Sequence, residues 1–415
     1  MKIAVMGHGV VGSGTVEVFY KSKAAAERKT GKELDIKYIL DLRDFPDSPY
    51  ADKFIKDFSL IINDPEVGIV VEVMGGMKPA YEYTAACLRA GKSVVTSNKE
   101  LVAQKGAELL ALAAEHNVNY FFEASVGGGI PIIRPLHQCL AANEINEIAG
   151  ILNGTTNFIL TKMFREQMSF SDALALAQKL GYAEKDPTAD VEGHDACRKI
   201  CILASLAYGV HVFPDAVHTE GITTLTSEDV EYAENWGGVI KLIGRVKRLE
   251  SGKLAAMVSP AFIADSSQLS SVDDVYNGIL VRGDATGDVI FYGRGAGKLP
   301  TASAVVADII DVAKANGTSH SLTWIDTGEK LVVDYREVPA SLYVRLSGSS
   351  RDSVLAAAKA VFDGVESSLL TRRHCPDTEL AFVTTTCPEC ELAEKLTQLE
   401  QRGVKVLAKV RVLDY

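Results

Sequence analysis

The chain has 415 residues, of which 47% are hydrophobic and 23% charged, a globular composition that excludes a single small module and a disordered or collagen-like chain. Its 43 Lys and Arg residues face 54 Asp and Glu residues, and the resulting net charge of −11 argues against nucleic acid or an anionic membrane as a partner. Seven cysteines, an odd number, argue against a disulfide framework and for a reducing compartment, so we expect a cytoplasmic protein. The first residues lack a signal-peptide pattern, and we expect no membrane span.

The first part of the chain alternates short apolar runs with amphipathic segments. Buried strands are expected at Ile3–Met6, Ile36–Leu40, Ile69–Met74, Ser93–Thr96 and Tyr120–Glu123. Helices are expected between them near Gly12–Ala26, Pro79–Ala90 and Lys105–His116. This alternation predicts an α/β fold of the Rossmann type, a doubly wound parallel sheet, in a dinucleotide-binding domain at residues 1–128.

Longer helices and then strand-like runs follow. The helices are expected at Thr155–Arg165, Ser171–Leu180 and His194–Tyr208, and the strands between Val239 and Tyr292. Such segregation predicts an α+β catalytic and dimerisation domain at residues 129–318. Pro300–Ala315 reads as a further apolar helix, and whether the helix at 300–318 packs back on the first domain is left open.

The last part of the chain, residues 338–415, is expected to form a unit of its own after a polar linker at Gly317–Arg336. Its expected elements are strand Ser341–Leu346, helix Arg351–Phe362, strands Ser367–Thr371 and Leu380–Thr385, helix Glu389–Gln401 and strand Val404–Val412. This βαββαβ order is ferredoxin-like. We therefore expect a truncation after about Arg336 to leave a catalytically competent core.

A glycine-rich turn, Gly7-His8-Gly9-Val10-Val11-Gly12, follows the first expected strand and opens the first helix. Glycines there permit a tight turn, the close approach of a pyrophosphate and helix–strand packing, and the helix N-terminus favours the phosphate charge. The pattern predicts that Gly7, Gly9, Val10, Val11 and Gly12 bind NAD or NADP. The alternative is a plain glycine turn in a flavodoxin-like sheet, and His8 is interpreted as a turn residue.

Two oppositely charged residues follow the second expected strand. Asp41 is placed to bind a free ribose 2′-hydroxyl, whereas Arg43 could meet a 2′-phosphate, so the choice between NAD and NADP stays open. Either residue could instead be a solvated loop charge.

Another polar segment, Thr96-Ser97-Asn98-Lys99, ends the fourth expected strand. Ligands of open α/β sheets bind at such carboxyl ends, so Thr96 and Lys99 are candidates for the cofactor or substrate site. The alternative for Lys99 is an exposed lysine that begins the next helix.

The segment from Gly181 to Lys199 is the densest in ionisable groups. Asp195 and Lys199 are one turn apart on a helix that is otherwise largely apolar, so they share one face. An ordinary surface pair would contribute only a few tenths of a kcal/mol. Charge on an apolar helix face instead favours a functional role.

The motif Cys387-Pro388-Glu389-Cys390, with His374-Cys375 upstream, could hold zinc or form a redox pair. The second half of a zinc site is missing, so small semi-buried thiols are the favoured interpretation.

Five motifs resemble the homoserine dehydrogenase family in order and spacing over nearly the whole chain. They are the segment at 96–99, Phe122 to Pro131, Asn153-Gly154-Thr155-Thr156-Asn157, the block from Glu184 to Lys199, and Gly293 to Thr301. The resemblance implies NAD(P)-linked interconversion of L-homoserine and L-aspartate 4-semialdehyde, a step towards threonine and methionine. The C-terminal unit resembles the ACT domain of many bacterial members.

The same resemblance assigns roles to individual residues. Glu184 would bind the substrate amino group, Asp195 the substrate and the surrounding lysines, and Lys199 would donate or accept the proton. Lys99 would bridge substrate and cofactor. Gly154 and Gly297 would line the nicotinamide side.

A cation, an effector and an oligomer are implied as well. Glu123, with the backbone carbonyls of Val126, Gly128 and Ile130, resembles the family's site for a monovalent cation, Na⁺ or K⁺. The protein is expected to be a homodimer or homotetramer that binds threonine as a candidate effector.

The residue types fit this chemistry without the resemblance. Hydride leaves the carbinol carbon while the hydroxyl proton needs a base, and a lysine supplies one when burial or a neighbouring cation lowers its pKa.

The sequence leaves two other functional hypotheses open. An amino-acid sensor with a degenerate nucleotide fold would not need Lys99, Glu184, Asp195 and Lys199, and a dehydrogenase acting on aspartate would not account for the 184–199 block.

Overall fold

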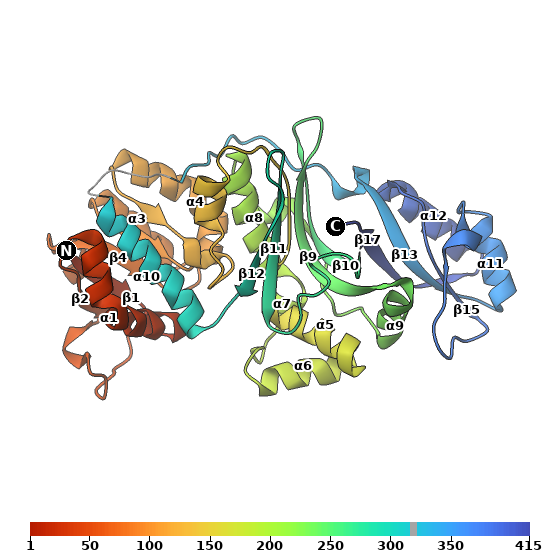
Figure 1. Cartoon of the computed structure of the whole chain (residues 1–415), viewed down its shortest axis with the longest axis horizontal. Helices are drawn as coiled ribbons and strands as arrows, with labels where there is room; N and C mark the ends of the chain where they lie inside the picture. The colour runs from red at the N-terminus through yellow and green to blue at the C-terminus, as the bar shows by residue number, and fades with distance from the viewer. Residues whose placement is uncertain (316–321) are drawn as a thin grey trace.

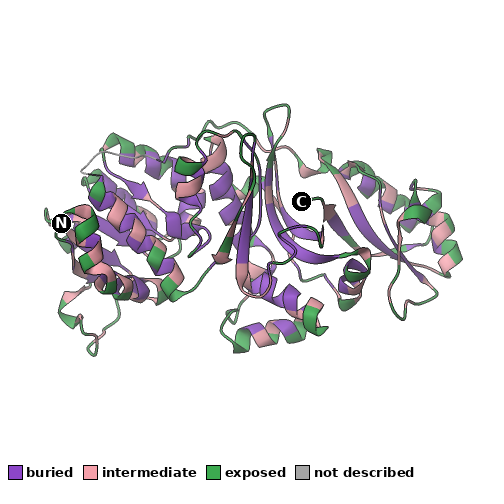
Figure 2. Ribbon diagram, in the orientation of Figure 1, coloured by how far each residue is buried: buried purple, intermediate pink, exposed green. Residues whose placement is uncertain are grey.

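A computed structural model describes residues 1–315 and 322–415 and shows an elongated molecule with three regions in a row (Figure 1). The N-terminal sheet lies at one end, a mixed region lies in the middle, and the C-terminal unit lies at the other end. Burial concentrates in the strands of both sheets (Figure 2). Within the described ranges, no helix has the length and apolar character needed to cross a membrane.

The N-terminal sheet has six parallel strands in the order β3-β2-β1-β4-β5-β6. Its strands are β1 (Lys2–Met6), β2 (Asp35–Leu40), β3 (Phe54–Ile55), β4 (Val67–Glu72), β5 (Ser93–Thr96) and β6 (Tyr120–Phe121). This is the strand order of a dinucleotide-binding sheet, which confirms the Rossmann prediction. The two-residue β3 was not predicted, since it is too short to show a period.

The helices around this sheet are α1 (Val10–Thr30), α2 (Ser59–Ile62), α3 (Ala80–Arg89) and α4 (Lys99–Glu115). The predicted start of α4 at Lys105 is wrong, because the Asn98 side chain caps the helix earlier by accepting the Leu101 N–H at 3.1 Å.

Helix α10 (Lys298–Lys314) returns to the first region and lies against α1 (Figure 1). Val305 and Ile309 belong to the same apolar core as Val16 of α1. A Cβ on Gly14 would lie 2.8 Å from the Lys298 backbone, so a glycine is needed for this close approach. The packing that the sequence left open is therefore present.

The middle region supplies the first half of a second, mixed sheet. Its elements are β7 (Ile145–Ile151), α5 (Gly154–Glu166), α6 (Phe170–Lys179), α7 (Thr188–Val191), α8 (His194–Tyr208), β8 (His218–Thr219), α9 (Ser227–Trp236), β9 (Gly238–Arg248), β10 (Leu254–Ala264), β11 (Tyr276–Gly283) and β12 (Gly287–Arg294). Strand β7 and helix α9 were not predicted. The polar start of α9 is held by a capping box between Thr226 and Asp229, which hydrophobic periodicity does not reveal.

The C-terminal unit runs in the predicted βαββαβ order. Its elements are β13 (Pro339–Ser347), α11 (Arg351–Lys359), β14 (Leu369–Leu370), β15 (Glu379–Val383), β16 (Cys387–Pro388), α12 (Glu389–Gln401) and β17 (Lys405–Leu413). Four of these strands lie in the order β17-β13-β15-β14, and the short β16 pairs with the start of β13.

The second sheet is continuous through both regions. Its order is β12-β11-β7-β9-β10-β17-β13-β15-β14, and β10 pairs in parallel with β17, for example Ala261 with Arg411. The predicted linker at 317–336 begins outside the described residues, and its later part contacts the middle region where Leu254 donates to Leu331. The C-terminal unit therefore shares one sheet with the middle region.

A buried arginine links the two halves of this sheet. The guanidinium of Arg411, which is 4% exposed, donates to Glu220 of the middle region at 2.7 and 2.9 Å. It also donates to Glu389 at the start of α12 at 3.0 and 2.5 Å. Such bidentate pairs are strong and orientation-specific. A truncation after Arg336 would leave Glu220 without this arginine and β10 without its neighbour.

We expect Arg411→Met to lower the free energy of unfolding by about 3–5 kcal/mol, because it leaves two carboxylates without their cation. Denaturant unfolding of the full chain measures this. The matched control is Arg336→Met, which removes a solvent-exposed pair with Asp334 and should leave the stability nearly unchanged. Equal stability of the two variants would show that Arg411 does not hold the regions together.

Candidate active site

A cavity of about 510 Å³ lies where α4 of the first region meets α5, α7 and α8 of the middle region. Residues of the segment before α10 also line it. Most of the lining is polar or small: Lys99, Asn153, Gly154, Thr155, Gly181, Tyr182, Glu184, Asp186, Ala189, Asp190, Asp195, Arg198, Lys199, Val275, Arg294, Ala296 and Gly297.

The carboxylate of Asp195 is the centre of this site. It lies in the first turn of α8, is 3% exposed, and contacts one lysine through each oxygen. Oδ1 lies 2.6 Å from Lys99 Nζ, and Oδ2 accepts from Lys199 Nζ at 2.7 Å. Burial alone would raise the pKa of Asp195, but the two lysines and the amide of Asn153 outweigh it and hold that pKa far below its usual range.

The two lysines experience different environments. Lys199 is buried and also donates to the Leu152 carbonyl at 2.7 Å. Burial lowers the pKa of Lys199 and Asp195 opposes that effect, with a net decrease. The charge of Asp195 instead raises the pKa of Lys99. Of the two, Lys199 is thus the better candidate for a proton acceptor.

The sequence-based assignment missed two residues of this site, Asp190 and Asn153. The side-chain amide of Asn153 donates to Asp190, near the end of α7, at 2.7 Å and to Asp195 at 2.8 Å. Burial raises the pKa of Asp190, and the neighbouring Asp195 adds to that shift. Asp190 belongs to the ionisable block at 184–199, whose charge density was a usable signal. Asn153 belongs to a quoted motif but had no assigned role.

The structure brings the other predicted substrate and nicotinamide residues to the same cavity. Glu184 lines it from the exposed loop before α7. Gly154 is the first residue of α5, and a Cβ there would lie 2.9 Å from the Val275 carbonyl. Gly297 caps α10 with a φ of 119°, a conformation that favours glycine.

The predicted dinucleotide turn has the expected geometry. Gly7 has a φ of 99°, and a Cβ on Gly12 would lie 2.0 Å from the Gly7 carbonyl. A Cβ on Gly9 would meet nothing within 4 Å, so this position is open towards a ligand. Helix α1 begins at Val10, followed by Val11, without a side-chain cap, which leaves its N-terminal N–H groups available for a pyrophosphate.

The side chains of Asp41 and Arg43 form an ion pair with each other, so they are not two independent charges. The Arg43 guanidinium donates to Asp41 at 3.0 and 2.9 Å, and this pairing holds the pKa of Asp41 well below its usual range. Asp41 also accepts the His8 N–H at 2.8 Å, which ties the end of β2 to the glycine turn.

Thr96 contacts a buried carboxylate that was not predicted. Its hydroxyl donates to Glu72 at the end of β4 at 2.7 Å and accepts the Asn98 N–H at 2.9 Å. Burial raises the pKa of Glu72. Thr96 therefore orders the strand ends beneath the cofactor crevice.

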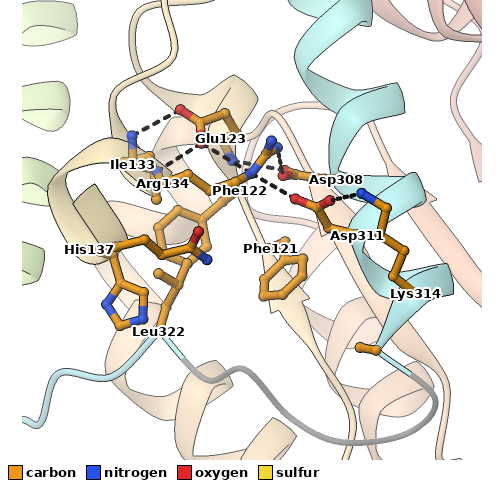
Figure 3. Close-up of a pocket in the computed structure, with 12 residues that line it drawn as sticks. Phe121, Phe122, Glu123, Ile133, Arg134, His137, Asp308, Asp311, Lys314 and Leu322 are labelled. Carbon is orange, nitrogen blue, oxygen red and sulfur yellow. Dashed lines mark hydrogen bonds and ion pairs between the residues drawn. The ribbon is translucent and has the colours of Figure 1, made fainter. Parts of the chain in front are cut away.

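The side chain of Glu123 is fully engaged inside the protein (Figure 3). Its carboxylate accepts the N–H groups of Ile132, Ile133 and Arg134 at 2.7 to 2.9 Å. Arg134 in turn pairs with Asp308 of α10, and burial raises the pKa of that aspartate to about 7. Since these groups satisfy the Glu123 carboxylate, it has little capacity left for a metal.

All seven cysteines lie in the described ranges, and each is a free thiol. Within those ranges no group of three or more His, Cys, Asp or Glu residues could hold a metal ion, so the structure supports no zinc site at Cys387 and Cys390.

A dinucleotide-type sheet beside a polar cavity with two lysines on one carboxylate is the arrangement of a nicotinamide-dependent oxidoreductase that acts on a small molecule. Comparison with known proteins specifies the class further. Residues 7–123 match the family model "Homoserine dehydrogenase, NAD binding domain", and residues 131–310 match "Homoserine dehydrogenase".

Relatives and solved structures agree with these matches. The homoserine dehydrogenase of Neisseria gonorrhoeae is 37% identical over 96% of this chain and 95% of its own length. The crystal structure of the Thiobacillus denitrificans homoserine dehydrogenase covers 100% of this chain and 98% of its own, with 35% identity and a TM-score of 0.89. A hyperthermophilic archaeal homoserine dehydrogenase mutant in complex with NADPH covers 75% of this chain and 97% of its own, with 31% identity and a TM-score of 0.64.

The chain belongs to the homoserine dehydrogenase family, and it is an NAD(P)-dependent oxidoreductase acting on a CH–OH group. The sensor and the aspartate-specific dehydrogenase hypotheses are thereby set aside.

Proposed function

We propose that Lys199 is the general acid–base residue in the interconversion of L-homoserine and L-aspartate 4-semialdehyde. The observation that carries this proposal is the placement of Lys199 Nζ, buried at the cavity wall and held at 2.7 Å by both Asp195 and the Leu152 carbonyl. Burial favours the neutral amine, which can take the substrate hydroxyl proton, and the neighbouring Asp195 stabilises the ammonium that results. In the reverse direction the ammonium returns the proton to the aldehyde oxygen.

The remaining charged residues of the cavity bind and orient the substrate in this proposal. The side chain of Glu184 lies at the cavity rim without an ion pair or hydrogen bond to the described residues, and it would bind the substrate ammonium. Lys99 would bind the substrate or the nicotinamide side, with Asp195 fixing its ammonium. NAD(P) supplies the hydride acceptor or donor when bound, and Gly154 and Gly297 leave room for its nicotinamide.

Cofactor choice depends on the Asp41–Arg43 pair. Asp41 would accept a ribose 2′-hydroxyl, and Arg43, 62% exposed in its side chain, can turn towards a 2′-phosphate. We therefore propose that both NAD and NADP are accepted. The related archaeal protein was solved with NADPH.

A monovalent cation, Na⁺ or K⁺, would bind the glycine-rich turn after Glu123. The carbonyls of Val126, Gly128 and Ile130 accept no hydrogen bond from the described residues, and all three residues are buried. Unpaired carbonyl oxygens suit a hard cation. Glu123 would contribute through its backbone oxygen, since its carboxylate is engaged.

The domain assignment remains part of the proposal: a dinucleotide-binding domain at 1–128, a catalytic and dimerisation domain at 129–318, and an ACT-like regulatory domain at 338–415.

The exposed edge strand β12 supports a dimer, either alone or within a tetramer. Its Tyr292 is 56% exposed and its Ile290 is 38% exposed. Threonine would bind the ACT-like unit as an effector. The scattered cysteines support a cytoplasmic location.

We expect Lys199→Met to lower kcat for homoserine oxidation by about 10²–10⁴-fold, the span of a general acid–base residue, with cofactor affinity nearly unchanged. Absorbance of NAD(P)H measures turnover, and nucleotide fluorescence titration measures affinity. Lys253→Met, at an exposed position outside the cavity, is the matched control and should keep wild-type activity. A folded Lys199→Met enzyme with near-normal kcat would overturn the assignment and make Lys99 the next candidate.

For the cofactor, we expect Arg43→Ala to favour NAD and Asp41→Ala to favour NADP, because each variant removes one of two opposed ribose contacts. The wild-type ratio of kcat/KM for the two cofactors should be modest. A ratio beyond about a thousandfold, roughly 4 kcal/mol of discrimination, would mean that one of the two residues does not face the ribose.

A further inference from the structure

The side chain of Asn153 uses its full hydrogen-bonding capacity inside the active site. Its Nδ2 donates to Asp190 Oδ1 at 2.7 Å and to Asp195 Oδ2 at 2.8 Å, two carboxylates on different helices. Its Oδ1 accepts from the backbone N–H and the hydroxyl of Thr156 at 2.8 and 3.0 Å. An asparagine amide has two donor hydrogens and one oxygen with two lone pairs, so no capacity is left over.

This network fixes the orientation of the amide. The Thr156 N–H can only donate, so the atom facing it has to be the amide oxygen. The NH₂ group therefore faces the two carboxylates. Asn153 is 5% exposed, and it ends the loop between β7 and α5, where it is the N-cap of α5.

The residue before it supplies the second part of the same arrangement. The carbonyl of Leu152 accepts from Lys199 Nζ at 2.7 Å, while Lys199 also binds the Asp195 oxygen that Asn153 contacts. Leu152 and Asn153, which follow β7, thus hold two groups together. These are Lys199, the proposed proton acceptor, and its carboxylate partner Asp195.

We propose that Asn153 is a positioning residue that keeps the carboxylates of Asp190 and Asp195 separated and charged, so that Asp195 can hold Lys99 and Lys199 in register with the substrate. The proposal rests on the acid–base role of Lys199 proposed above. Without a shared donor, two buried carboxylates that face one site repel each other, and one of them tends to take up a proton. A protonated Asp195 would bind both lysines more weakly.

The charged groups around the side-chain amide of Asn153 come from three helices. Lys99 lies on α4, Asp190 on α7, and Asp195 and Lys199 on α8. Arg198 of α8 adds a weaker positive charge near Lys99 and lies 3.8 Å from Glu100. A change at Asn153 should therefore alter the titration of the whole group and not only the stability of α5.

The test is Asn153→Asp in the full-length enzyme. An aspartate keeps the oxygen that caps α5, but it replaces the shared donor with a third negative charge. We expect the ascending limb of the kcat–pH profile for homoserine oxidation to move up by about one pH unit or more, because added negative charge stabilises the Lys199 ammonium. We also expect kcat/KM near neutral pH to fall about tenfold or more.

Asn153→Ser provides a second variant if the aspartate variant does not fold. It keeps a capping oxygen, adds no charge and removes the shared amide donor. Because Asp195 then holds the Lys199 ammonium more weakly, we expect the ascending limb to move to lower pH, opposite to the aspartate variant, with reduced kcat. The control is Ser169→Ala, which removes the N-cap of α6 outside the cavity. It should lower the melting temperature and leave the pH profile in place.

A folded Asn153→Asp or Asn153→Ser enzyme whose profile coincides with that of the wild type would reduce Asn153 to a helix cap. In that case Lys199→Met would still be inactive. If Lys199→Met were itself active, the acid–base assignment would fail instead, so the two failures are distinguishable.

Discussion

The arrangement of the active site depends on one buried carboxylate. Asp195 is nearly inaccessible to solvent, yet it contacts a lysine from α4 of the first region, a lysine on its own helix and an amide from the strand end at β7. A buried charge is costly unless it is paired and hydrogen-bonded. The partners of Asp195 are Lys99, Lys199 and Asn153, which all line the cavity. The same interaction joins the first region to the middle region, and in the proposed function cofactor and substrate would meet there.

The elements behind this carboxylate explain why it is held so firmly. Helix α8 runs through the apolar core of the middle region, where Ile200 and Leu203 are almost fully buried. Helix α10 returns from the second sheet to cover α1, and its Asp308 accepts the backbone N–H of Glu123. Strand β17 joins the C-terminal unit to β10, so binding at that unit would act on a sheet that also carries the substrate region.

Much of this arrangement could be predicted from the sequence, and the exceptions have a common physical cause. Alternating apolar runs and the glycine turn predicted the parallel sheet, because both are local patterns. The spacing of Asp195 and Lys199 predicted their contact for the same reason. By contrast, the contact of Asn153 with Asp190, the pairing of β10 with β17 and the ion pairs of Arg411 join residues far apart in the chain. No local period encodes such contacts. Asp41 and Arg43 were read as alternatives because sequence does not show that their side chains pair with each other.

The central claim is that Asp195 sets the protonation of Lys199, and the pH dependence of kcat in an Asp195→Asn enzyme tests it most directly. The negative charge of Asp195 raises the pKa of Lys199 against the effect of burial. Removing that charge leaves two lysines near each other without their shared counter-ion, so the account predicts that the ascending limb for homoserine oxidation moves to lower pH, with reduced kcat. A limb that stays at the wild-type position, or that moves to higher pH, would contradict the account.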